Sequence, residues 1–244
     1  MDIWETLDDR YRRQIDLPEI GDSGQEALGK SKVLIVGMGG LGSPVAYYLA
    51  AAGVGHLTLM DNDTIAPNNL NRQILYSEDQ VDGDKAIAAK KRLNEFNSEI
   101  DIKIDRRMID LSNAENIIKN FDLVMSCVDT LEGRRAVNFG CVKSKTPMVD
   151  GAVQLFSGYV FPIIPFETAC YNCALGDLVD QPVPKPVLGS IVGTIGTLMV
   201  TEAIKYLCDI ESDLFGKMLI CDFKELSFQK INVKKIENCE VCGK

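Results

Sequence analysis

The apolar positions in the first 150 residues form short continuous runs that alternate with longer segments of helical spacing. Residues 33–36 are all apolar, which is typical of a parallel strand buried on both faces of a sheet. Further strands are predicted at residues 56–60, 100–104, 121–126 and 147–149, and helices at residues 44–52 and 84–96. This alternation predicts a doubly wound, Rossmann-like α/β fold with a mainly parallel sheet.

The pattern changes after residue 150, where apolar and polar residues alternate with a period of two. Residues 153–164 and 218–233 predict antiparallel strands that continue the sheet, and residues 190–207 predict a helix with an apolar face. The prolines of residues 176–186 predict a loop. We expect a single domain over residues 1–244, in which an N-terminal arm (1–30) precedes an α/β half (31–150) and a second half (151–244).

The net charge of the chain is −9, which argues against a nucleic acid as its main partner because phosphates favour a basic surface. Its first residues lack the basic stretch and apolar core of a signal peptide, and its longest apolar run, residues 187–200, is shorter than a membrane span. We therefore expect a cytoplasmic protein that binds neither nucleic acid nor membrane. In that compartment, its eight cysteines favour metal ligands or free thiols over disulfides.

A glycine-rich segment joins the strand at residues 33–36 to the next predicted helix. Gly37, Gly39 and Gly42 fit the pattern G-x-G-x-x-G, which lets the backbone approach phosphates at a helix N-terminus. Asp61 follows the next strand, where a carboxylate can bond ribose hydroxyls. These residues alone fit NAD at least as well as ATP. An NAD-dependent oxidoreductase and a glycine turn without a ligand both remain open at this point.

Further polar residues lie just beyond the carboxyl ends of predicted parallel strands: Asn69, Arg72, Gln73, Lys85 and Asp129. Open α/β sheets bind their ligands at this edge. Two cations and an amide-rich loop exceed what a diphosphate needs and favour a triphosphate. Asp129 would supply a carboxylate for Mg²⁺. The single histidine, His56, precedes the second strand at the opposite edge, and we expect it to be structural.

Two C-x-x-C pairs, Cys170 with Cys173 and Cys239 with Cys242, lie far apart in the sequence. Four thiolates form a closed tetrahedral zinc site, so the pattern favours one structural zinc ion over two separate pairs or redox chemistry. The other four cysteines stand in apolar segments and are predicted to be core residues: Cys127, Cys141, Cys208 and Cys221.

These motifs resemble those of the ThiF/MoeB/HesA family of ubiquitin-activating-enzyme-like adenylyltransferases. The resemblance covers residues 10–243 and rests on the segments at 10–14 (RYRRQ), 37–42 (GMGGLG), 61–63 (DND) and 69–73 (NLNRQ), together with Lys85, Asp129 and the two cysteine pairs. It implies a homodimer that uses ATP and Mg²⁺ to adenylate the C-terminal glycine of a small ubiquitin-like sulfur carrier of the ThiS or MoaD type. Pyrophosphate is released.

The resemblance also implies roles for individual residues. Arg13 would reach the site from the second subunit, and Arg72, Lys85 and Asp129 would complete the catalytic set, with Asp129 binding Mg²⁺. The nucleotide would be held by Gly37, Gly39, Gly40, Gly42, Asp61, Asp63, Asn68, Asn69, Arg72, Gln73, Lys85, Asp129 and Thr130. Thr130 departs from the asparagine usual in the family, which leaves its role open. Residues 31–150 would be the nucleotide-binding half, and residues 151–244 the carrier-binding and zinc half.

The loop at residues 176–188 contains no cysteine, whereas many ThiF-type enzymes carry one there that bonds covalently to the carrier. We therefore expect adenylation without an enzyme-bound thioester, with sulfur supplied by a separate sulfurtransferase. The pathway served by the carrier, whether thiamine, molybdopterin or another, is open. Adenylation of a peptide or other carboxylate in natural-product biosynthesis is the main alternative, and a non-catalytic zinc-stabilised scaffold is another.

Overall fold

The computed structural model describes residues 10–179 and 186–243. Its centre is an eight-stranded sheet with the strand order β3-β2-β1-β4-β5-β6-β7-β8. The strands are β1 (Lys32–Val36), β2 (His56–Met60), β3 (Asp101–Asp105), β4 (Leu123–Ser126), β5 (Met148–Gln154), β6 (Ser157–Ile163), β7 (Lys217–Asp222) and β8 (Ser227–Asn232). Strands β1 to β5 pair in parallel and β5 to β8 antiparallel, which confirms the predicted fold class.

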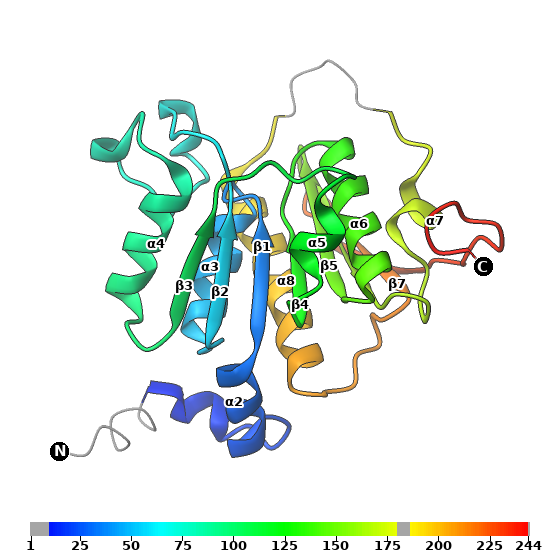
Figure 1. Ribbon diagram of the computed structural model, residues 1–244, viewed down its shortest axis with the longest axis horizontal. Coiled ribbons are helices and arrows are strands. Elements are labelled where there is room, and N and C mark those ends of the chain that lie inside the picture. Colours follow the sequence, from blue (N-terminus) through cyan, green and yellow to red (C-terminus); the bar gives the residue numbers. More distant parts are fainter. Residues whose placement is uncertain (1–9, 180–185, 244) are drawn as a thin grey trace.

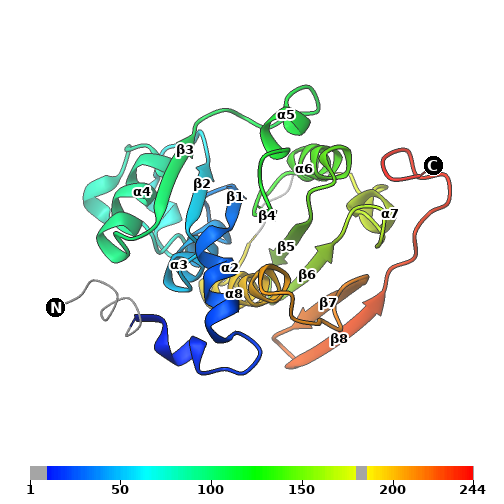
Figure 2. The same ribbon diagram turned by 60° about the horizontal axis from the view of Figure 1, so that its bottom comes forward.

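Helices cover both faces of this sheet (Figures 1 and 2). The helices are α2 (Gly21–Lys30), α3 (Gly42–Ala51), α4 (Lys85–Phe96), α5 (Ala114–Ile118), α6 (Leu131–Ser144), α7 (Tyr171–Leu175) and α8 (Gly189–Leu207), with 3₁₀ turns η1 (Pro67–Asn69) and η2 (Glu78–Gln80). Helices α3, α4 and α8 contribute to one apolar core, and α5, α6 and α7 to a second core on the opposite face. Residues 10–15, which we call the arm helix, form one further helical segment.

The strand order reverses beside β1, which pairs with β2 on one side and with β4 on the other. Val36 at the end of β1 lies opposite both Met60 and Ser126, so the carboxyl ends of these strands meet at one edge. This topological switch point is where open α/β sheets bind ligands. The loops that carry the predicted nucleotide residues leave the sheet at this edge.

Two local predictions from the sequence were wrong, namely that Ser43 caps α3 and that Ile87 lies on the apolar side of α4. Helix α3 begins at Gly42 without a side-chain cap, and the hydroxyl of Ser43 donates instead to the Gly39 carbonyl at 2.8 Å. Helix α4 does begin at the Asp84 cap, but Ile87 is 51% exposed. Its buried side is formed instead by small residues and Leu93, because Ala86, Ala89 and Leu93 recur with helical spacing and are fully buried.

Within the described residues, no helix is both long enough and apolar enough to span a bilayer. The longest helix, α8, packs against α3, β5 and β6 in the core. Part of the predicted proline-rich loop, residues 180–185, lies outside the described residues.

Candidate nucleotide site and metal centre

The glycine loop makes a tight turn that only glycine permits. Gly37 has a φ of +93°, and a Cβ added there would lie 2.8 Å from the Cys127 carbonyl oxygen. A Cβ at Gly42 would lie 1.9 Å from the Gly37 carbonyl oxygen. The backbone therefore folds directly onto itself before α3, which is the geometry that exposes N–H groups to a phosphate.

Two side chains from neighbouring segments hold Met38 in the middle of this loop. Asp61, at the end of β2, accepts from the Met38 N–H at 2.7 Å and from the Asp63 N–H at 2.8 Å. The buried hydroxyl of Tyr76 donates to the Met38 carbonyl at 2.7 Å. An ionised carboxylate has about four lone-pair positions, so Asp61 retains acceptor capacity for ribose hydroxyls.

The loop after β2 brings a cation to the glycine loop. The Nη1 atom of Arg72 donates to the Asn68 carbonyl and to Asn71 Oδ1, both at 2.8 Å. The Cδ atom of Arg72 lies 3.6 Å from the position that a Cβ on Gly40 would take. Asn69 holds the loop itself, because its Oδ1 accepts from the Ala66 N–H at 3.1 Å. Arg72 makes no ion pair with a described residue, so its charge is available to an anion.

Lys85 and Gln73 are buried at the same edge. Lys85, 5% exposed, pairs with the exposed carboxylate of Asp63 at 2.9 Å. Gln73 is 4% exposed, and its Oε1 atom has no hydrogen-bond partner among the described residues. Its amide nitrogen lies 3.5 Å from the Cβ position of Gly39. A buried acceptor without a donor costs about 1–3 kcal/mol, so this atom fits a site that a polar ligand completes.

The segment after β4 closes the site on its other side. The backbone of Cys127 packs against Gly37, and Asp129 is exposed two residues further on. Thr130 caps α6, since its Oγ1 accepts from the Gly133 N–H at 3.1 Å. The unusual threonine therefore has a structural role that an asparagine would also perform.

A buried polar cluster joins the end of β4 to α6, β5 and β6, and the sequence did not predict it. Asp150 is fully buried and bonds Arg134 and Ser126, both at 2.6 Å, and Tyr159 at 2.7 Å. Burial lowers the pKa of Arg134, but the adjacent carboxylate more than offsets this and keeps it above its ordinary value. The only signal in the sequence was the position of Asp150 at a strand carboxyl end.

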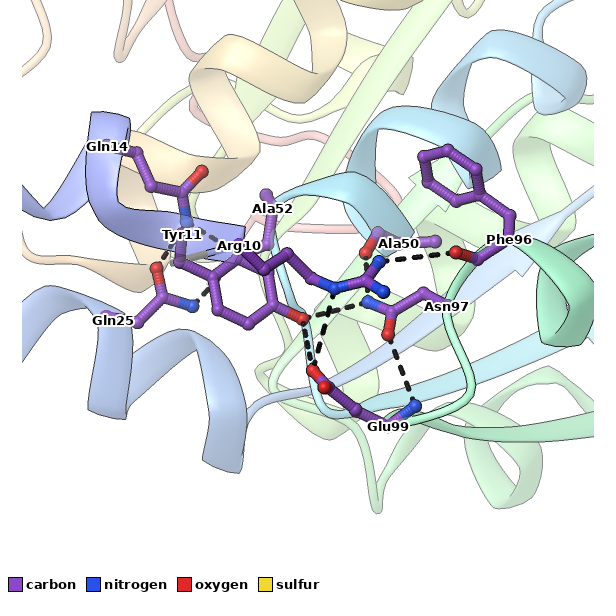
Figure 3. Close-up of polar contacts among 9 residues, drawn as sticks. All are labelled: Arg10, Tyr11, Gln14, Gln25, Ala50, Ala52, Phe96, Asn97 and Glu99. Carbon is purple, nitrogen blue, oxygen red and sulfur yellow. Dashed lines mark hydrogen bonds and ion pairs between the residues drawn. The ribbon is translucent and has the colours of Figure 1, made fainter. Parts of the chain in front are cut away.

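The structure does not bring Arg13 to this site. The arm helix docks against residues that follow α3 and α4, at the amino ends of the strands (Figure 3). His56 begins β2 at that same edge, with its Nδ1 atom 3.6 Å from Asp101, and is half exposed. It lies far from the glycine loop, as predicted.

The two C-x-x-C pairs come together as one cluster. The Sγ atoms of Cys170 and Cys173 are 3.9 Å apart, those of Cys170 and Cys239 3.8 Å, and those of Cys173 and Cys242 3.5 Å. All four lie within 4.8 Å of one another. Sulfur atoms at ~2.3 Å from a tetrahedral zinc ion are separated by roughly 3.8 Å, whereas a disulfide would need about 2.0 Å. The donor set therefore fits one metal ion and not two separate pairs.

The environment of these thiols differs from one to the next. Burial raises the pKa of Cys170. It also opposes ionisation of Cys239, but the N–H groups of Cys242 and Val241 outweigh it and lower the pKa to about 7. The other cysteines occupy the core as predicted: Cys127, Cys141 and Cys221 are buried and Cys208 is partly buried.

A ThiF family model matches residues 11–241, so the chain belongs to the ThiF family. It is 40% identical to the adenylyltransferase and sulfurtransferase MOCS3 of Drosophila sechellia, over 96% of this chain and 53% of that protein. The chain thus spans about half the length of the MOCS3 proteins that it matches. It is 37% identical to the sulfur carrier protein adenylyltransferase of Thermus thermophilus, over 96% of this chain and 90% of that protein.

Solved structures agree with the fold. The crystal structure of Escherichia coli MccB with ATP superposes with a TM-score of 0.87 and 25% identity, over 96% of this chain and 74% of that one. The glycine loop, Asp61, Arg72 and Lys85 therefore meet at one edge of a fold whose relative has been solved with ATP.

Proposed function

We propose that this chain is an adenylyltransferase that uses ATP and Mg²⁺ to activate the C-terminal glycine carboxylate of a small ubiquitin-like sulfur carrier. The observation that carries the proposal is the position of Arg72 beside Gly40, without an ion-pair partner among the described residues and at the same edge as buried Lys85. The names of the MOCS3 and Thermus thermophilus relatives support the reaction type. The MOCS3 relatives are named as both adenylyltransferase and sulfurtransferase, and here we propose that a separate sulfurtransferase supplies the sulfur.

The chemistry follows from the charges at this edge. A carboxylate oxygen of the carrier attacks the α-phosphorus of ATP, a carboxyl-adenylate forms, and pyrophosphate leaves. A terminal carboxyl group has a pKa of about 3.3–3.7 and is already ionised, so the reaction needs no general base. The main barrier is the repulsion between the carboxylate and the triphosphate. Arg72 and Lys85 would lower this barrier by neutralising phosphate charge.

The remaining residues would bind and orient the nucleotide. The N–H groups of the glycine loop would face the phosphates, and Asp61 would accept from the ribose hydroxyls. Asp129 would hold Mg²⁺, which would neutralise part of the triphosphate charge. The four clustered cysteines would hold a structural zinc ion, and this ion would tie the C-terminal segment to α7, beside which it lies in Figure 1.

We further propose a cytoplasmic homodimer in which Arg13 serves the site of the other subunit. Within one chain, Arg13 stands at the amino ends of the strands and Arg72 beyond their carboxyl ends. Figure 1 shows α2, which follows the arm helix, and the segment between β2 and α4 at opposite ends of β1. A second subunit would bring an arm to each site.

The test is ATP–pyrophosphate exchange with ThiS-type and MoaD-type carriers. Arg72→Ala and Asp129→Ala should each lower exchange at least about 100-fold, the usual effect of losing one group that stabilises transition-state charge. Lys143→Ala, on the exposed side of α6, removes a cation away from the site and should keep the parental rate. Unchanged exchange in Arg72→Ala would refute the assignment. Exchange with a short peptide but with no carrier would change the substrate class.

A further inference from the structure

The arm helix is fixed to the body of the protein by contacts around Tyr11 (Figure 3). The ring of Tyr11 is 7% exposed and fills the space over Gly53, where an added Cβ would lie 2.7 Å from ring atoms. The Tyr11 hydroxyl accepts from Asn97 Nδ2 at 2.8 Å and donates to Glu99 Oε2 at 3.3 Å. These bonds join residues 86 and 88 positions apart in the sequence.

Asn97 makes this attachment rigid. It is fully buried, and its Nδ2 atom also donates to the Ala50 carbonyl at 2.8 Å, while its Oδ1 atom accepts from the Glu99 N–H at 3.2 Å. The side chain thus ties together the ends of α3 and α4 and the arm helix. A buried amide with its donors and acceptor satisfied specifies one arrangement, because any shift would leave a polar atom unpaired.

A second anchor lies on the other side of Arg13. Gln14 Nε2 donates to the Ala52 carbonyl at 2.8 Å and also bonds the side chain of Gln25. Gln25 Nε2 donates to the same Ala52 carbonyl at 3.1 Å. Arg13 therefore stands between two fixed residues, Tyr11 and Gln14, and its backbone position is set by both.

The three arginines of this segment have different surroundings. Arg10 lies 3.8 Å from Glu99 and donates to the Phe96 carbonyl at 3.2 Å, and Arg12 pairs with Asp16 at 2.9 Å. Arg13 is exposed and makes no ion pair with any described residue. The anchored helix thus presents one cation outward that no carboxylate of the described residues pairs with.

Arg13 cannot reach the nucleotide site of its own subunit while these anchors hold. The five residues of β1 separate the two edges of the sheet by ~17 Å at about 3.3 Å per residue. Tyr11 is fixed at the amino edge, and the two residues from it to Arg13 span at most about 7 Å even when fully extended. The side chain would also have to pass through the packed body of the subunit.

We propose that Tyr11, through its bonds to Asn97 and Glu99, is a positioning residue that presents Arg13 to the nucleotide site of the partner subunit. This inference rests on the proposed function and adds the device that sets the geometry of the arm. An arm helix that is already held in place loses no conformational freedom when its cation binds the nucleotide, whereas a free arm would. The bonds of Tyr11 therefore favour catalysis and not only stability. The bonds of Tyr11 lie within one subunit, but they raise the rate at the nucleotide site of the other.

Mixed dimers test this transfer directly. Two differently tagged chains are co-expressed, and dimers that carry both tags are purified. One chain bears Arg72→Ala, so only the other chain has a working site, and that site is served by the arm of the Arg72→Ala chain. Tyr11→Phe, which keeps the ring and removes the hydroxyl, is then placed on either chain, and ATP–pyrophosphate exchange is measured.

Tyr11→Phe on the Arg72→Ala chain should lower kcat about fivefold, which is roughly what one hydrogen bond is worth. Tyr11→Phe on the other chain should leave the rate of the mixed dimer unchanged, because that arm serves a dead site. A loss only when Tyr11→Phe is on the other chain would show that the bond acts within its own subunit. Equal losses in both arrangements, or no loss in either, would show no transfer from one subunit to the other. Each of these outcomes would overturn the proposal. Glu99→Gln, which removes the charge of the acceptor and its ion pair with Arg10, should repeat the asymmetry.

The failure of the proposed function has a different signature. If parental dimers show no exchange with any carrier or peptide, adenylation itself is refuted. If exchange occurs but no dimer with both tags can be recovered, adenylation stands and the positioning role of Tyr11 between subunits is refuted.

Discussion

Met38 shows how single residues of the glycine loop are placed by distant side chains. Its N–H group donates to Asp61 and its carbonyl accepts from Tyr76, 38 residues further along the chain. Burial strongly raises the pKa of Tyr76, so its hydroxyl remains a donor. The position of Asp61 at this edge was predictable because it follows a strand directly, but its bond to the Met38 N–H was not. The role of Tyr76 was not predictable either, because it depends on how the loop between β2 and α4 folds back.

Asp150 and Arg134 form a buried ion pair whose effect on stability can be measured. Asp150→Asn keeps the shape of the side chain but leaves Arg134, 5% exposed, without a carboxylate. We expect the free energy of unfolding to fall by about 3 kcal/mol, as when one partner of a buried pair is removed. Urea denaturation followed by circular dichroism measures this change.

The matched control removes both charges. The double variant Arg134→Met with Asp150→Leu should be more stable than Asp150→Asn, because it leaves no uncompensated charge in the core. If the double variant proves less stable, the bonds of Asp150 to Ser126 and Tyr159 matter more than charge balance.

At the level of elements, the sequence predicted what depends on local pattern and missed what depends on long-range packing. The strands and the long helices α4 and α8 follow from apolar periodicity and capping. The exposure of Ile87 was missed because alanines form the buried side of α4. The site of the arm helix was missed because Tyr11, Gln14 and their partners lie far apart in the sequence.

Removal of the metal should release the C-terminal segment from α7. A structural zinc ion contributes folding energy, and a change of 1 kcal/mol corresponds to roughly 2–4 °C in Tm for a chain of this size. We expect Cys173→Ser to lose the bound zinc, to lower Tm by more than about 5 °C, and to make residues 233–243 sensitive to protease. Elemental analysis and calorimetry measure the first two effects.

Cys208→Ser is the control because its thiol lies outside the cluster. It should retain one zinc ion per chain and a protected C-terminal segment. Full zinc content in Cys173→Ser, or an unchanged Tm after chelation, would show that the four thiols do not hold a structural metal ion.

For the whole molecule, the residues of the proposed reaction divide between two edges of one sheet. The candidate nucleotide site was predictable because parallel strands bring their carboxyl ends together, and Val36 indeed lies opposite Met60 and Ser126. The distance of Arg13 from this site was not predictable, because sequence patterns do not show where an N-terminal arm docks. The resemblance to the ThiF family had assigned Arg13 to a second subunit, and the separation within one chain is the physical reason to propose it.

Whether the reaction stops at the adenylate or continues to a thioester depends on the cysteines of the whole chain. Residues 176–188 contain no cysteine, and Cys127, Cys141 and Cys221 are buried. Burial raises the pKa of each of these three thiols, which disfavours the nucleophilic thiolate.

With carrier and ATP, we therefore expect the acyl-adenylate to accumulate and no thiol-labile adduct to form with this chain. Intact-mass spectrometry with and without dithiothreitol tests this, and trapping with hydroxylamine confirms that the adenylate is present. An adduct at carrier plus chain mass that dithiothreitol removes would mean that the reaction continues to a thioester.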